Sequence, residues 1–501
     1  MMVPSRLRIL PLLLALAAAA LAGCAGGSSS SSTPLTLDSV MDEELLPRTR
    51  IDYVQRLWEL EERGEASHDA VRERLKRVAW LRGTWWKVRM AAIETLLEDE
   101  ANLDDTRNML RLMLPTEPSA DLTLAVGEIA AARGWTDLAP AFVRRWSRVD
   151  PLAVDNERVE YKSLRRLFPD RPIEDVVFDV FMDEELQTPT MLDDEARQLR
   201  HRDDAWALLR RLDTRGERTI NLLRATNVAA DDEVVRQLRR GATELGVVPD
   251  TRPEMEWLRR LLEPGERAYW DACAAVVARL SPEQRRGLRL RHLPILLYLS
   301  EHDPARLNWS QAQLVDRIDD TLRERRRHPR SRGVGGEMLS DESIGRFRDE
   351  IVWADAQAIL HAAEVIVEPE LAGWIFSQAE RDREDSSTEH GGVISYASDG
   401  SVRITTFEPR IAQRRGDRQF TAPPDMILVS DAAPFHYHLH AQEYRYAEYA
   451  GPSHQDELYA AEQARCCLVF TFVSRDAMDV DYYQPGRVTI DLGEIRRPES
   501  Q

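Results

Sequence analysis

Residues 435–441 read Phe-His-Tyr-His-Leu-His-Ala, and the alternation in this stretch decides how the C-terminal part of the chain is interpreted. Successive side chains of a β-strand point to opposite faces of a sheet, so a strand here separates two kinds of side chain. One face carries three imidazoles, those of His436, His438 and His440. The other face is apolar. The stretch therefore predicts a strand with a buried apolar side and a side rich in metal-ligand nitrogens.

The residues on both sides of this stretch have the patterns of further strands and one amphipathic helix. Alternating or continuous apolar runs bounded by Gly, Pro and Asp are typical of strands, whereas apolar residues at helical spacing indicate a helix. The expected elements are a short strand over 364–369, a helix over 370–385, a strand over 388–396 with a turn at 398–400, a strand over 426–430, a buried strand over 467–473 and a closing hairpin around Gly486. Their order predicts an α/β domain over 364–497.

Two further motifs flank the histidines in chain order. Glu389 comes just before a strand that begins with Gly391-Gly392, and Ser453-His-Gln-Asp456 opens a helix expected over 457–464. A Glu before a Gly-containing strand, then His-x-His, then Ser-x-x-Asp resembles the JAB/MPN/JAMM metallopeptidase-like family. The resemblance covers 364–497 and implies an α/β fold with a mainly antiparallel sheet.

The resemblance also implies a role for each of these residues. It implies that His438, His440 and Asp456 hold one Zn²⁺ with a water in the fourth position, and that Glu389 takes a proton from this water. Ser453 would then steady the tetrahedral intermediate. The donor types agree with this assignment, because two imidazoles and a carboxylate with an open position are typical of catalytic zinc.

Three departures from the family pattern leave a second interpretation open. One is His436, which adds a competing ligand or an outer hydrogen-bond donor. The Pro that follows the second family His is Ala441 here, and the spacing from His440 to Ser453 is longer than the family norm. The first hypothesis is a zinc-dependent hydrolase of amide or isopeptide bonds. The alternative is a non-catalytic scaffold whose JAMM-like domain is degenerate.

Residues 49–345 have the pattern of many short helices. Apolar residues recur at helical spacing, as in Ile51, Val54 and Trp58, and Gly or Pro interrupts the pattern at short intervals. Such a succession resembles HEAT-type helical repeats, although no strict period is present and an irregular α-domain stays open. The Trp residues are expected in the core. A helical solenoid usually presents a concave surface to a protein or peptide, which is the partner that we expect.

The first residues are typical of a bacterial lipoprotein. Two arginines precede an apolar run over 9–22, which ends at Leu21-Ala22-Gly23-Cys24 and resembles a lipobox. We expect a signal peptide over 1–23, a lipid on Cys24 and a flexible linker over 24–48, so that the lipid anchors the chain to a membrane. An ordinary secretory signal is the alternative. Ala25 is not the Asp that retains lipoproteins at the inner membrane, which favours the outer membrane, facing the periplasm.

Composition restricts the remaining possibilities. The chain is 43% hydrophobic and 31% charged, as in globular proteins, and its 501 residues predict more than one domain. The net charge of −19 argues against a nucleic-acid partner, because phosphates attract a basic surface. The basic run over 323–332 is interpreted as a solvated helix end and linker.

Overall fold

A computed structural model of the chain describes residues 34–150, 153–183, 195–226, 232–329, 331–332, 338–339, 341–397, 399–414, 416 and 420–498. Cys24, the predicted lipidation site, and the signal peptide before it lie outside the described residues. Among the described helices, none is both long and apolar enough to cross a membrane. The chain divides into two compact units, Met1–Met109 and Leu110–Gln501.

The first unit is helical wherever it is described. Its helices are α1 (Pro47–Gln55), α2 (Glu59–Glu62), α3 (His68–Trp80), α4 (Trp86–Leu96) and the first part of α5 (Leu103–Met113). Ser67 caps α3 by accepting a hydrogen bond from the Ala70 amide at 3.2 Å. Buried Arg72 joins α3 to the start of α5 through Asp99 and through Asp105, the latter at 2.6 Å. The cap fixes the start of α3, and the buried guanidinium joins α3 to the start of α5.

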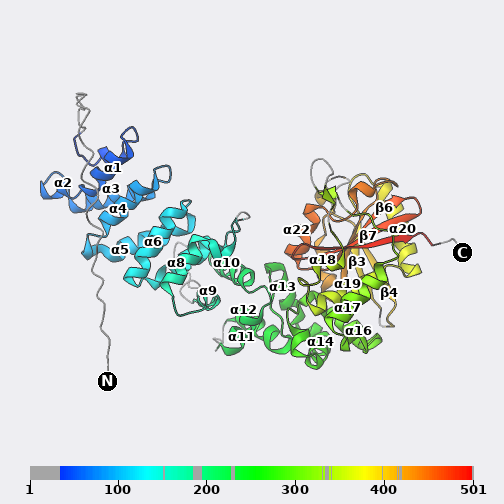
Figure 1. Ribbon diagram of the computed structural model, residues 1–501. Coiled ribbons are helices and arrows are strands. Elements are labelled where there is room, and N and C mark those ends of the chain that lie inside the picture. The colour runs from blue at the N-terminus through cyan, green and yellow to red at the C-terminus, as the bar shows by residue number, and fades with distance from the viewer. Residues whose placement is uncertain are drawn as a thin grey trace, which may run out of the picture. The chain divides into compact units, whose positions relative to one another are not determined.

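The second unit begins with further helices. They are α6 (Ala120–Arg133), α7 (Ala139–Ser147), α8 (Val159–Leu167), α9 (Ile173–Met182), α10 (Glu195–Leu212), α11 (Glu217–Ala225), α12 (Glu233–Arg240), α13 (Arg252–Leu261), α14 (Arg267–Arg279), α15 (Pro282–Arg285), α16 (Leu293–His302) and α17 (Gln311–Leu322) (Figure 1). Trp146, Trp206, Trp257 and Trp270 are fully buried. The predicted helical character of the region is confirmed for the described residues. The expectation that the tryptophans lie in the core is confirmed for these four but is wrong for Trp80 and Trp85, which are 37% and 44% exposed.

A mixed six-stranded sheet completes the second unit. Its strands are β3 (Gly391–Tyr396), β4 (Val402–Phe407), β5 (Phe435–His440), β6 (Cys467–Ser474), β7 (Ala477–Gln484) and β8 (Val488–Arg496), in the order β4-β3-β5-β6-β7-β8. The prediction of a mainly antiparallel sheet is corrected, because the central pair β5–β6 is parallel. A parallel pair needs a crossover connection, and the segment that contains α22 (His454–Gln463) provides it. Two residues each of β1 (Ser331–Arg332) and β2 (Met338–Leu339) form a separate pair.

Two expected strands do not form, and helices occupy the ends of 364–369 and most of 426–430. Residues 364 and 365 end α19 (Trp353–Val365), and residue 369 begins α20 (Pro369–Glu384), so no strand lies at 364–369. The alanine-rich turns before Glu364 extend the helix into the short apolar run that resembled a strand. Likewise, 426–430 falls largely in α21 (Pro424–Val429), where Pro424 occupies the first helical turn. Short apolar runs do not distinguish a strand from a buried helix, which explains both errors.

Ion pairs tie the preceding helices to the sheet region. Asp431 accepts hydrogen bonds from Arg260 of α13 at 2.6 Å and from Arg465, which follows α22, at 3.0 Å. Asp355 of α19 accepts from Arg291 at 3.0 Å and contacts His292 at 2.9 Å. These partners are largely buried, so breaking either cluster would leave an uncompensated charge in the interior.

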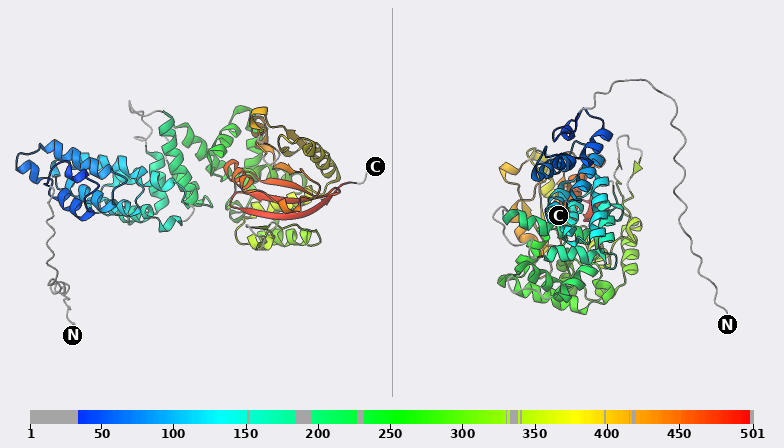
Figure 2. Two further views of the ribbon diagram at one scale, coloured as in Figure 1. Left: turned by 90° about the horizontal axis from the view of Figure 1, so that it is seen from above. Right: turned by 90° about the vertical axis from the view of Figure 1, so that its left-hand side faces the viewer.

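Helices lie on both sides of the sheet (Figure 1; Figure 2, left). The apolar face of β5 packs against α19 and α20, where Phe435 contacts His361 and Tyr437 meets Trp374 edge-on. The imidazole face is turned toward α22, since His436 is hydrogen-bonded to Tyr459 of that helix at 2.7 Å. The predicted division of β5 into an apolar face and an imidazole face is confirmed.

Candidate metal centre

The strand β5 and the first turn of α22 bring the predicted ligands together. His438 and His440 project from the same face of β5. Asp456 is held by a capping box, in which its Oδ2 accepts from the Ser453 amide at 2.7 Å and its own amide donates to Ser453 Oγ at 3.3 Å. The cap fixes the carboxylate at the start of the helix, next to the two rings.

The separations between the donor atoms suit a small tetrahedral ion. His438 Nε2 lies 3.2 Å from His440 Nε2, and Asp456 Oδ2 lies 3.4 Å and 3.9 Å from these two nitrogens. Ligands bound to tetrahedral zinc at about 2.0–2.2 Å are separated from one another by about 3.3–3.6 Å. The donor types and their spacing therefore fit Zn²⁺, and the three predicted ligands do lie together.

Hydrogen bonds to residues outside the ligand set orient both imidazole rings. His440 Nδ1 contacts the backbone carbonyl oxygen of Tyr449 at 3.1 Å, and His438 Nδ1 contacts the hydroxyl of Tyr483 at 3.3 Å. Phe420 stacks nearly parallel to the His438 ring, with centroids 6.4 Å apart. When Nδ1 of each ring is occupied in this way, Nε2 is left to face the shared point.

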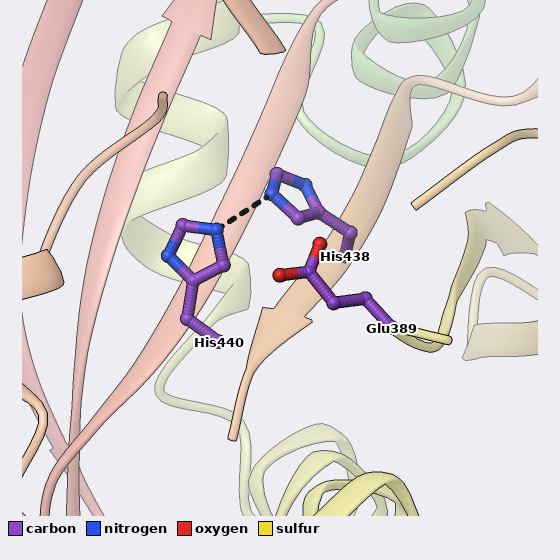
Figure 3. A group of neighbouring side chains, drawn as sticks. All are labelled: Glu389, His438 and His440. Carbon is purple, nitrogen blue, oxygen red and sulfur yellow. Dashed lines mark hydrogen bonds between the residues drawn. The ribbon is translucent and has the colours of Figure 1, made fainter. Parts of the chain in front are cut away.

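The Glu389 carboxylate approaches the point that the Nε2 atoms of His438 and His440 face. Glu389 is buried, precedes β3, and accepts a hydrogen bond from Gln442 Nε2 at 3.1 Å. Its carboxylate points toward the two imidazoles (Figure 3), and each of the three residues offers one ligand atom within 4.8 Å of the others. Glu389 thus competes with Asp456 as the third ligand, and a substitution at each position can distinguish their roles.

The two glycines after Glu389 permit the close packing of β3. A Cβ on Gly391 would lie 2.6 Å from the backbone oxygen of Tyr437, and a Cβ on Gly392 would lie 2.0 Å from that of Thr405. Both contacts are with neighbouring strands. Side chains at these positions would push β3 away from β4 and β5 and would displace Glu389 with it.

The charges in the cluster give two of the three predicted ligands, His440 and Asp456, the protonation state that a metal ion requires. Burial and the neighbouring His438 lower the pKa of His440 to about 4. Burial opposes the charged form of His438, but Asp456 and Glu389 outweigh it and raise the pKa of this ring. Burial would raise the pKa of Asp456, yet His438 and His440 hold it well below its usual range. At neutral pH, Asp456 is a carboxylate and His440 is neutral, as metal binding requires.

Ser453 and His436 lie near this centre with partners of their own. The Ser453 hydroxyl belongs to the helix cap described above. His436 pairs with Tyr459 through Nδ1, while its buried Nε2 has no hydrogen-bond partner among the described residues. Burial, reinforced by Arg465, lowers the pKa of His436 well below its ordinary value, so the ring stays neutral.

A cavity of about 370 Å³ adjoins the centre. His438 and Asp456 line it, together with His436, Leu458 and Phe420. The cavity brings the metal-ligand cluster into contact with space that a small group of a substrate could fill.

Sequence reasoning missed the residues that orient the ligands. No sequence motif marks Tyr483, Gln442 or the Tyr449 carbonyl. Strand pairing and a loop bring them to the site. Comparisons with known protein families, curated proteins and solved structures find no match for the chain.

Proposed function

We propose that the C-terminal part of the chain is a zinc-dependent hydrolase of amide or isopeptide bonds. The observation that carries the proposal is the convergence of His438 Nε2, His440 Nε2 and Asp456 Oδ2 within 3.9 Å, with the Glu389 carboxylate facing the two imidazoles. Two imidazoles, one carboxylate and an adjacent acid are the groups that hydrolytic zinc sites use. The resemblance to JAMM-like metallopeptidases points to the same chemistry.

Three residues would bind the ion, and two further groups would orient the imidazole ligands. His438, His440 and Asp456 would hold the ion, and Tyr483 and the Tyr449 carbonyl would keep the rings in position. Bound Zn²⁺ would polarise a carbonyl oxygen and lower the pKa of a water toward 7.

Two further residues would act on the proton of the attacking water and on the substrate carbonyl. Glu389, held at one oxygen by Gln442, would accept the proton of the attacking water at its carboxylate and return it to the leaving nitrogen. Ser453, the residue that caps α22 next to Asp456, would contact the substrate carbonyl oxygen as the tetrahedral intermediate forms. Substrate would enter through the cavity beside His438 and Asp456.

Hydrolysis of defined substrates tests the proposal. Zinc-loaded protein is incubated with a mixture of linear peptides and of peptides joined through a lysine side chain, and the products are followed by mass spectrometry. We expect cleavage by the wild type, none by His438→Ala, and full activity in His454→Ala, whose imidazole is exposed on α22. A zinc-loaded wild type that cleaves neither class of bond would favour the non-catalytic scaffold.

The proposal includes the cellular localisation of the protein. The Leu21-Ala22-Gly23-Cys24 ending after an apolar run supports a lipid-anchored protein of the bacterial envelope, with the helical region binding a protein or peptide. We expect Cys24→Ala to leave the membrane fraction or to keep its signal peptide. Unchanged fractionation together with unchanged mass would contradict lipidation.

A further inference from the structure

A second group of acidic residues lies on the same face of the sheet as the histidines. Asp479 and Asp481 are two residues apart on β7, and Asp491 of β8 pairs directly with Asp481. Through the strand register, Asp481 lies in the same row as Val469 of β6 and His438 of β5. The group is thus separated from the histidine centre by one intervening strand.

These three carboxylates are unusual because they are close together and fully covered. Asp479 and Asp481 are 0% exposed and Asp491 is 2% exposed. One oxygen from each lies within 4.8 Å of the others. Asp491 accepts hydrogen bonds from the Gly493 amide at 2.8 Å and the His328 amide at 3.0 Å, which fix its orientation. Three buried acids so close together need a proton or a cation between them.

Two buried polar groups at this place point to a missing ligand. Neither carboxylate oxygen of Asp479 has a hydrogen-bond partner among the described residues. Thr471 of β6 pairs with Asp479 on the same face, and its buried hydroxyl also has no partner there. A bound cation would satisfy a buried carboxylate that has no hydrogen-bond partner and a neighbouring hydroxyl that also has none.

We propose that Asp479, Asp481 and Asp491 form a Ca²⁺ site that stabilises the β7–β8 hairpin. The donors are all oxygens, which favours a hard cation over zinc. Oxygens bound to Ca²⁺ at about 2.3–2.6 Å lie at most about 5 Å apart, as these do. Mg²⁺ usually keeps several waters, whereas these carboxylates are closed off from solvent, so Ca²⁺ fits better.

The wild-type protein itself provides the first test. Full-length protein is stripped with EDTA, and its thermal unfolding midpoint is measured in EDTA, in CaCl₂ and in MgCl₂. We expect CaCl₂ to raise the midpoint by a few degrees, and by more than MgCl₂ does, because an ion that binds only the folded state stabilises it. A midpoint that is the same in EDTA and in CaCl₂ overturns the proposal, and the carboxyl groups then hold protons.

Variants assign the effect to these residues and separate it from the histidine centre. Asp479→Asn should weaken calcium binding about tenfold or more by calorimetry, since calcium affinity depends on ligand charge. Asp476→Asn, at a side chain 78% exposed on the β6–β7 turn, should bind calcium as the wild type does. His438→Ala should lose zinc and keep the calcium response. A calcium response that survives in Asp479→Asn but disappears in His438→Ala would overturn the assignment.

Discussion

Replacing Glu389 with Gln should separate zinc binding from catalysis. Glutamine keeps the shape of the side chain and the oxygen that accepts from Gln442 Nε2 at 3.1 Å, so the local fold should hold. It removes the negative charge and with it the capacity to take a proton. If Asp456 is the third ligand, Glu389→Gln should retain about one zinc per chain.

The size of the loss follows from the proton transfer that is removed. General-base catalysis contributes about 10²–10⁴-fold in rate, so hydrolysis by Glu389→Gln should fall at least about a hundredfold, which is about 2.7 kcal/mol in activation free energy. Asp456→Asn should behave differently. Asparagine keeps an oxygen that can accept from the Ser453 amide, but it removes the charge of a donor that lies 3.4 Å from His438 Nε2, so zinc should be lost with activity.

Zinc content by elemental analysis and initial hydrolysis rates, measured on the same preparations, check this pair of variants. His454→Ala serves as the control for substitutions on α22. Loss of zinc in Glu389→Gln with retention in Asp456→Asn would make Glu389 the ligand and would refute the assignment. Full activity in Glu389→Gln would remove this residue from the mechanism.

Two further predictions concern stability. Gly392→Ala should destabilise the second unit by about 3 kcal/mol or more in urea unfolding, because its methyl group would lie 2.0 Å from the Thr405 backbone oxygen. The control Gly345→Ala should not, since its methyl group meets only Ser343 Oγ at 3.7 Å. Equal unfolding midpoints for the two variants would contradict the packing of β3. Burial, reinforced by Arg306, lowers the pKa of His361 to about 3, so the unfolded chain takes up a proton first as the pH falls from about 6.5. Stability should then decrease toward pH 4, and His361→Asn should reduce that slope by about 1.4 kcal/mol per pH unit; an unchanged slope would contradict it.

The proximity of His438, His440 and Asp456 was predictable from the sequence because the pattern is local. His-x-His on one strand must place two rings on one face, and Ser-x-x-Asp at a helix start predicts the capping box that fixes Asp456. The helix over 370–385, the hairpin around 398–400 and the strands at 467–473 and near Gly486 were also predictable from periodicity and turn residues.

The remainder depends on tertiary packing that a pattern does not contain. The run at 364–369 is apolar enough for a strand, but it continues an alanine-rich helix that the sheet buries. The parallel pairing of β5 with β6 depends on a crossover, and neither strand encodes its direction. The aspartates of β7 and β8 come together only through strand register, so their spacing along the chain gave no sign of a cluster.

The zinc content of the purified wild-type protein tests the central claim most directly. The protein is stripped with EDTA, reloaded with a small excess of ZnCl₂, freed of unbound metal and analysed for zinc, alongside His440→Ala and the control His454→Ala. The arrangement of His438, His440 and Asp456 predicts about one zinc per chain in the wild type and the control, and close to none in His440→Ala. A folded wild type that takes up no zinc, or a His440→Ala variant that holds as much as the wild type, would contradict the account.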